Sequence, residues 1–272
     1  MAYEFPPLTP GDAKTVAARV AAVLQDAWQR LTDQQTAVLA ALSESGRAPH
    51  MVARLAEFQA AIADFQQRVD AEARAFVTRQ LPVLYEQGAQ QAAKTVGGRF
   101  TWTLIHTEAL QSLAADSYAD FLRRSQEEQR MAAAFYRAVR EAARREVPLL
   151  AAGNTTALQA ARSLAERLAA EHQLLYVIYR GGARMPVQAW AESAVLAKSA
   201  VAYNAGTLNR AREAGVQYME VFDGSGCGWT SHKDPDKAYG TLRTVEDAAA
   251  WPISHPRCGR AFGPRPDVAT AP

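Results

Sequence analysis

Hydrophobic residues recur every three or four positions along most of the first 172 residues, which places them on one face of an α-helix. The first such helix should begin at Thr9-Pro10, an N-cap followed by a first helical position, and run to about Leu42. A second should run over residues 50–80, and Pro82 should kink or end it. The apolar stripe of the first helix is Val16, Val20, Leu24, Trp28 and Leu31, and that of the second is Val52, Leu55, Phe58, Ile62, Phe65 and Val69.

Three further helices are predicted in this part of the chain. One covers residues 83–96 and closes at Gly97-Gly98, and another covers 103–145 and ends at Pro148 and Gly153-Asn154. The polar segment 123–130 (RRSQEEQR) should be solvated on most sides. The last helix, capped by Thr155 or Thr156, runs to about residue 172. Residues 1–8 read as an extended arm. No partner residues cluster near the histidines of this part, so His50, His106 and His172 are expected to be surface or hydrogen-bond-satisfied histidines.

The pattern changes after residue 172. Residues 174–179 (LLYVIY) and 183–187 flank a glycine turn and predict a β-hairpin. Pro186 then opens a helix that Gly215 ends, and Gly206 inside it would allow another backbone to approach closely. Residues 216–222 and 239–245 are strand candidates, and 246–251 can form one helical turn.

The sequence therefore predicts a mainly α fold. An extended long-helix part, residues 1–172, precedes a small α+β module, residues 173–266, and residues 267–272 form a disordered tail. A net charge of only +2 does not demand a nucleic-acid partner. We expect neither a transmembrane segment nor a signal peptide, and synthesis in a cytoplasm.

The module contains both cysteines of the chain, each close to a histidine. Cys227 precedes His232 by five positions, and His255 precedes Cys258 by three, with 22 residues between the pairs. Two short-spaced pairs joined by a loop are typical of a tetrahedral zinc site. We predict that these four side chains bind a structural zinc, because four protein ligands leave no open position for a catalytic water.

Other interpretations of this segment stay open. The cysteines could form a disulfide, although cytosolic thiols remain reduced, or the segment could hold no metal. A zinc-dependent nuclease or hydrolase would use His232, Asp234 and Asp236 near the metal, whereas Asp234-Pro235-Asp236 is more often a turn. A DNA-binding zinc module would use three arginines as phosphate contacts, Arg257, Arg260 and Arg265.

Several motifs of the module occur in a characteristic order. YRGGARMPVQAWAE is followed by AYNAGTLNRAREAGVQYMEVFDGSGCGWTSH and then by HPRC. This succession resembles the minor capsid proteins of tailed bacteriophages, the Mu F-like head morphogenesis proteins, also called phage minor capsid protein 2. The resemblance covers about residues 173–266. It implies a hairpin, a long helix with an internal glycine, a Gly-Val strand entry and a cysteine-containing loop.

The resemblance also implies a function. Such a protein is a non-enzymatic component of the virion head, inside the head near the portal vertex, and is made in the bacterial host. Its implied partners are the portal protein or the major capsid protein, with several copies around the portal and weak contact with packaged DNA. Because helices this long outreach a small core, we expect parts of their stripes to be exposed and residues 1–172 to bind these partners.

Overall fold

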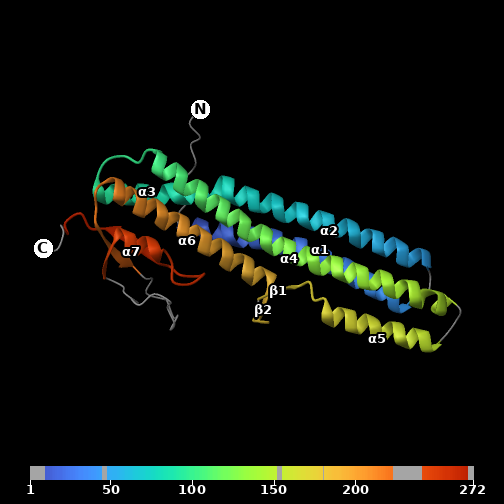
Figure 1. Ribbon diagram of the computed structural model, residues 1–272. Helices are drawn as coiled ribbons and strands as arrows, with labels where there is room; N and C mark the ends of the chain where they lie inside the picture. Colours follow the sequence, from blue (N-terminus) through green and yellow to red (C-terminus); the bar gives the residue numbers. More distant parts are fainter. Residues whose placement is uncertain (1–9, 45–47, 152–154, 180, 223–240, 269–272) are drawn as a thin grey trace. The chain divides into compact units, whose positions relative to one another are not determined.

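The computed structural model describes residues 10–44, 48–151, 155–179, 181–222 and 241–268, and most of them are helical (Figure 1). This confirms the mainly α fold with a small sheet module. The predicted arm at residues 1–8 and residues 269–272 of the predicted tail lie outside the described residues. The helices are α1 (Pro10–Glu44), α2 (Ala48–Ala75), the π-helix η1 (Phe76–Gln80), α3 (Leu81–Val96), α4 (Leu104–Ala151), α5 (Thr155–Glu171), α6 (Val187–Glu213) and α7 (Val245–Ala250). The strands are β1 (Tyr176–Ile178), β2 (Arg184–Pro186), β3 (Tyr218–Phe222), β4 (Leu242–Thr244) and β5 (Ala261–Pro264).

The predicted helix boundaries are largely confirmed. The first helix begins at Pro10, and α3 ends where Gly97 and Gly98 adopt φ angles of 85° and 77°. The helix α6 ends before Gly215, whose φ is 73°. Glycine is the residue that adopts such angles without strain, so these positions stop their helices as the sequence indicated.

The chain stays helical at two prolines, namely Pro82, which was predicted to kink or end its helix, and Pro148, which was predicted to end another together with Gly153-Asn154. Before Pro82 the chain changes to the π-helix η1, in which the Leu81 N–H bonds to the Phe76 carbonyl, and it then continues directly into α3. The wider turn accommodates a residue that has no N–H and whose ring clashes with the preceding turn. Likewise, α4 continues through Pro148 to Ala151, so its end follows the proline by less than one turn.

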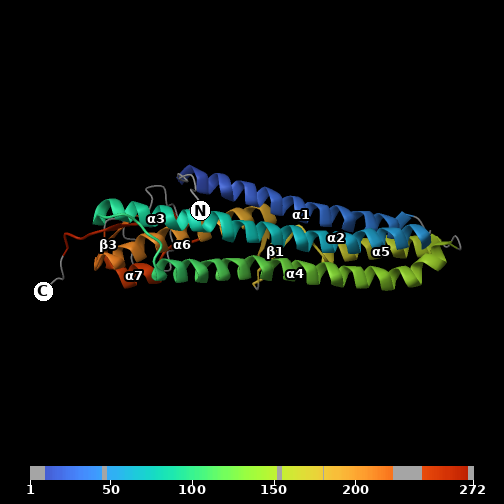
Figure 2. The same cartoon turned by 90° about the horizontal axis from the view of Figure 1, so that it is seen from above.

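The chain divides into two compact units, and each takes segments from both sides of residue 172. Unit 1 comprises residues 1–20, 74–119 and 191–272, and unit 2 comprises 21–73 and 120–190. Figures 1 and 2 show the parts of α1, α2, α4 and α5 in unit 2 running alongside one another. Aromatic side chains fill its interior, with the Trp28 and Phe65 rings 4.4 Å apart and those of Phe58 and Phe135 5.2 Å apart.

The polar segment 123–130 is exposed or half-buried on most sides, as predicted, but one of its faces is buried. Ser125 and Glu128 are both buried in unit 2. They stand in a row spaced alternately by four and three positions, which is the spacing of one helix face. The buried face of α4 therefore continues through the polar segment, even though its residues there are polar. The other buried members of the row are Phe121, Ala132, Phe135, Val139 and Ala142.

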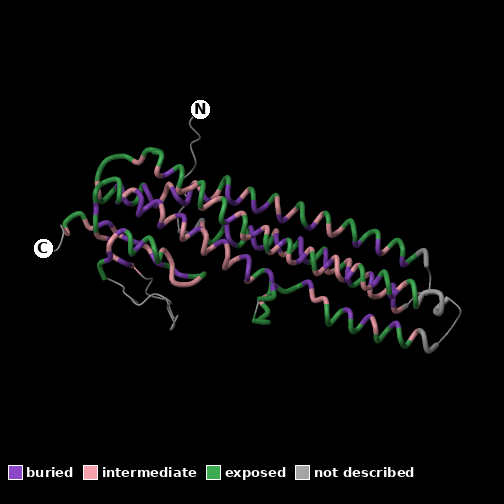
Figure 3. Tube along the Cα trace, in the orientation of Figure 1, coloured by how far each residue is buried: buried purple, intermediate pink, exposed green. Residues whose placement is uncertain are grey.

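The long apolar stripes are mostly buried, and the expected exposure is limited to positions such as Val52 of α2 and Leu104 at the start of α4. All five stripe residues of α1 are buried, and in α2 only Val52, at 66% exposure, lies largely in solvent. In Figure 3 buried and exposed positions alternate along each long helix. Neighbouring helices of the same chain cover most of these stripes.

Unit 1 contains a small sheet that packs against helices. The strand order is β4-β3-β5, and β3 pairs with both neighbours antiparallel, with Met219 opposite Arg243 and Val221 opposite Phe262. The third strand, β5, was not predicted. In unit 2, β1 and β2 form the predicted antiparallel hairpin. One hydrophobic cluster joins the sheet to α6 and α7, namely Leu208, Ala211, Val216, Met219, Val221, Val245, Ala248 and Phe262.

Candidate functional site

The predicted zinc ligands lie on both sides of the boundary of the described residues. Cys227 and His232 fall outside them, and His255 and Cys258 fall inside. The Cys258 N–H donates to the His255 carbonyl over 2.9 Å, which closes a turn around Pro256, and Cys258 is buried with a free thiol. Among the described residues no three His, Cys, Asp or Glu side chains are grouped to hold a metal ion. The zinc site thus stays a prediction, with two of its four donors placed on one turn.

A buried asparagine anchors the segment that carries this turn. The Nδ2 atom of Asn204, on α6, donates to the Pro252 carbonyl over 2.7 Å and to the Arg260 carbonyl over 2.9 Å. These two carbonyls bracket His255 and Cys258, and Asn204 is fully buried. Because buried carbonyls without partners are costly, the two bonds fix the segment on α6. The asparagine of the AYNAG motif therefore has a positioning role.

The glycine of the same motif permits a very close helix crossing within unit 1. A Cβ atom at Gly206 would lie 2.0 Å from the Tyr85 carbonyl oxygen, and one at Gly88 would lie 1.9 Å from that of Tyr203. The hydroxyl of Thr207 donates to the Gly88 carbonyl over 3.1 Å across the crossing. The prediction that Gly206 allows close backbone approach is confirmed, and its partner is α3.

A chain of hydrogen bonds that the sequence did not predict lies beside this crossing. The Nδ2 atom of Asn209 donates to the Tyr85 hydroxyl over 2.8 Å, and that hydroxyl lies 2.9 Å from His106 Nδ1. On the other side of the ring, His106 Nε2 lies 2.9 Å from Glu213 Oε2. Since Tyr85 accepts from Asn209, its own proton is free to bond to Nδ1, and Nε2–H then donates to Glu213. In this arrangement each hydrogen bond of the chain has one donor and one acceptor.

This order of groups, carboxylate, imidazole and hydroxyl, is the order that activates a nucleophile in hydrolases. The geometry argues for a structural role instead, because Tyr85 and His106 are both fully buried. Burial, opposed by the Asn209 hydrogen bond, raises the pKa of Tyr85 to about 12, so its hydroxyl is a poor nucleophile near neutral pH. His106 is thus a buried histidine with both ring nitrogens hydrogen-bonded, in line with the expectation of a surface or satisfied histidine, and its partners lie 21 and 107 positions away along the chain.

The three arginines of the DNA-binding interpretation are engaged within the protein. Arg260 is buried, and its Nη1 donates to the Trp251 carbonyl. Arg257 pairs with Glu192 at 3.5 Å, and Arg265 pairs with Glu220 and Asp267. This arrangement does not favour the DNA-binding interpretation. Of the nuclease interpretation, His232, Asp234 and Asp236 lie outside the described residues.

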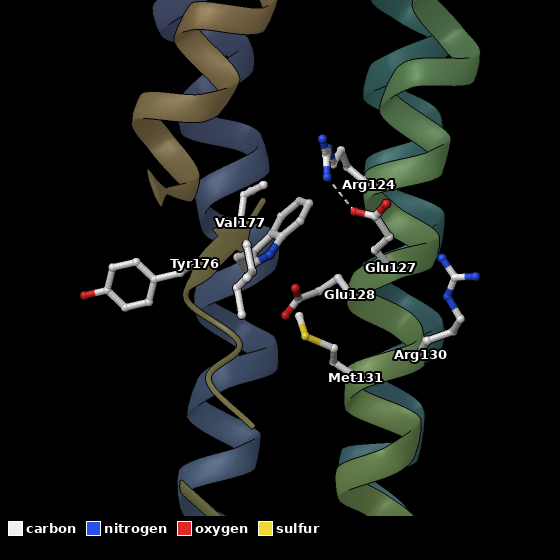
Figure 4. A pocket seen from close by; sticks show the side chains of 9 residues that line it. Arg124, Glu127, Glu128, Arg130, Met131, Tyr176 and Val177 are labelled. Carbon is white, nitrogen blue, oxygen red and sulfur yellow. Dashed lines mark hydrogen bonds and ion pairs between the residues drawn. The ribbon is translucent and has the colours of Figure 1, made fainter. Parts of the chain in front are cut away.

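Unit 2 contains a cavity of about 300 Å³ between α1, α4 and β1 (Figure 4). Glu128 of α4 points into it and is only 3% exposed, and Trp28 of α1 forms part of its wall. Within the described part of the chain, neither Glu128 Oε1 nor Trp28 Nε1 has a hydrogen-bond partner. Burial raises the pKa of Glu128 to about 8, and the nearby Trp28 indole N–H offsets part of the rise. No sequence pattern indicated this site, because the segment around Glu128 reads as a solvated helix surface.

Among the described residues no helix is long and apolar enough to cross a membrane. Comparisons of the chain with family models, curated proteins and solved structures found no match.

Proposed function

We propose that this chain is a minor head protein of a tailed bacteriophage, a structural component of the virion rather than an enzyme. The support is that the motifs carrying the resemblance occupy the kinds of elements it implies. YRGGARMP belongs to the β1–β2 hairpin, AYNAG lies on α6, and AGV leads into β3. Within AYNAG, Asn204 anchors the HPRC segment through its hydrogen bonds, and Gly206 permits the close packing of α3 against α6.

The proposal includes a structural zinc held by Cys227, His232, His255 and Cys258. The two described donors fit this role, because one turn holds both and the Cys258 thiol is free. The metal would crosslink the ends of the segment between β3 and the HPRC turn, and a metal bound in this way contributes directly to folding.

Elemental analysis of the purified full chain tests the zinc. We expect about one zinc per chain, lost together with local stability in Cys258→Ser. Lys94→Ala, an exposed change on α3, should leave the metal content unchanged. Zinc-free protein with immediately reactive thiols would refute the metal site, although the head-protein role could still stand.

The proposed partners are the portal protein or the major capsid protein, with several copies of the chain arranged around the portal inside the head. The full chain should co-purify with the portal or major capsid protein encoded beside it when they are expressed together. Crosslinking followed by mass spectrometry should place the contacts within residues 1–172. Labelled virions should carry the chain at one vertex. Virions in which the labelled chain cannot be detected would refute the proposal. Contacts confined to residues 173–266 would refute the assignment of partner binding to residues 1–172.

A further inference from the structure

The cavity beside Glu128 is built around a carboxyl group that lacks a cation. Arg124, four positions earlier on α4, forms a 2.7 Å ion pair with Glu127 and places its guanidinium 5.4 Å from the Tyr179 ring centre. Arg130 is exposed, and Figure 4 shows it pointing away from the cavity. Among the described residues, no arginine, lysine or histidine forms an ion pair with Glu128. A buried carboxylate in this position is costly unless a positive charge reaches it.

The walls of the cavity determine what kind of cation could reach it. Trp28, Met131 and Val177 present apolar surface, and Figure 4 shows Val177 and Met131 beside the Glu128 carboxyl. An indole is the aromatic group to which cations bind best. Tyr176 and Ile178 of β1, which also line the cavity, are each more than a third exposed, so the cavity adjoins solvent beside the hairpin.

Size and hydrogen bonding favour a small organic cation over a metal ion. About 300 Å³ is roughly ten times the volume of one water molecule. Glu127, the other carboxylate that lines the cavity, is paired with Arg124 at 2.7 Å, so a metal ion would find few available ligand oxygens beside Glu128. A primary ammonium on an aliphatic stem of four to five carbons would place its charge at Glu128 Oε1 and its stem against Met131 and Val177. The Trp28 N–H, which already lowers the pKa of this carboxyl, would support the carboxylate from its own side.

We propose that this cavity binds a primary alkylammonium group, with the Glu128 carboxylate as its counter-ion and Trp28, Met131 and Val177 around its stem. The group could belong to a free amine or to a lysine side chain, which share this chemistry. The proposal does not rest on the head-protein role, and either can fail without the other.

Proton linkage gives the proposal a specific signature. The charged groups around the cavity are Arg124, Glu127 and Arg130 of α4, and Tyr176 of β1 is the titratable group on the facing strand. Near neutral pH Glu128 carries a proton that an ammonium ligand must displace, because its pKa is about 8. The affinity should therefore rise about tenfold per pH unit between pH 6 and 8 and level off above, with about one proton released per ligand below pH 8.

Calorimetric titration of the full chain with n-butylammonium tests this, with n-butanol as the uncharged analogue. We expect the amine to bind with proton release and the alcohol at least tenfold more weakly. Glu128→Gln should abolish amine binding, whereas Glu141→Gln, which removes an exposed carboxylate of α4 that does not line the cavity, should retain it. Equal binding of amine and alcohol, unchanged amine binding in Glu128→Gln, or no amine binding at any pH up to 9 would each overturn the proposal. A parallel titration with Nα-acetyl-lysine methylamide distinguishes the sources, because a site for a protein lysine should bind both compounds.

Discussion

The crossing of α3 and α6 offers the sharpest test of the fold. In Gly206→Ala, the new methyl group would lie 2.0 Å from the Tyr85 carbonyl oxygen, whereas real Cβ contacts are essentially never shorter than 3.0 Å. Both sides of this contact are backbone, so no side chain can rotate away. The two helices must therefore separate by about 1 Å, the difference between these two distances.

The energetic cost can be estimated from three contributions. Overpacking a well-packed interior costs about 1–3 kcal/mol. Separation also weakens the Thr207–Gly88 and Asn209–Tyr85 hydrogen bonds, each worth about 1 kcal/mol. The higher helix propensity of alanine returns about 1 kcal/mol. The expected net loss is about 2–4 kcal/mol, which corresponds to a fall in Tm of roughly 6–12 °C.

Urea and thermal unfolding of the full chain would measure this loss. Gly181→Ala is the matched control, because a Cβ atom there meets nothing within 4 Å, and its stability should change by less than about 0.5 kcal/mol. Gly88→Ala should cost about as much as Gly206→Ala, and the double variant should cost less than the sum, because the first methyl already separates the helices. A Gly206→Ala protein as stable as the unsubstituted chain would refute the close crossing.

Three further changes test the buried polar groups. Asn204→Ala leaves the buried Pro252 and Arg260 carbonyls without their donor and should lower the free energy of unfolding by about 2–4 kcal/mol. Faster hydrogen exchange over residues 251–260 would confirm that the segment is released, whereas unchanged exchange would contradict the anchoring role of Asn204. The pKa of Glu213 lies below its usual value of 4.5, since burial raises it but hydrogen bonds from Thr103 and His106 and neighbouring positive charge outweigh that effect. The stabilisation from the Glu213 carboxylate is therefore present above pH 4.5 and lost as pH falls through the lowered pKa. Glu213→Gln should be less stable than the parent at pH 7, and this difference in stability should narrow by pH 3. A difference that stays constant with pH would count against these interactions of the carboxylate. Burial raises the pKa of Glu128 to about 8, so this group favours folding most below pH 4.5 and loses that contribution as pH rises towards 8. In urea unfolding, Glu128→Gln should have the same free energy of unfolding as the parent near pH 4 and exceed it by roughly 3–5 kcal/mol at pH 8–9. Equal stability at pH 9 would show that the carboxyl is not buried as described.

The local sequence determined the helices, the hairpin and the central strand β3. Periodicity identified α1, α2 and α6, and glycine and proline placed several of their ends, because these signals act within one or two turns of chain. Gly206 marked a close approach for the same local reason, since a helix interior seldom keeps a glycine that packing does not require. The short strand β5 gave no such signal, because residues 261–264 include Gly263 and Pro264 and pair with β3 only through long-range contact.

Only the tertiary structure decided which polar groups are buried and paired. His106 reads as an isolated histidine until the fold brings Tyr85, Asn209 and Glu213 around it. Glu128 reads as a solvated residue within RRSQEEQR, yet α4 presents one continuous face to unit 2 and its spacing places Glu128 on that face. The chain order likewise separates α3 from α6, which pack through Gly88 and Gly206 although these residues are 118 positions apart. Burial depends on what packs against a position, and no pattern within one segment records that.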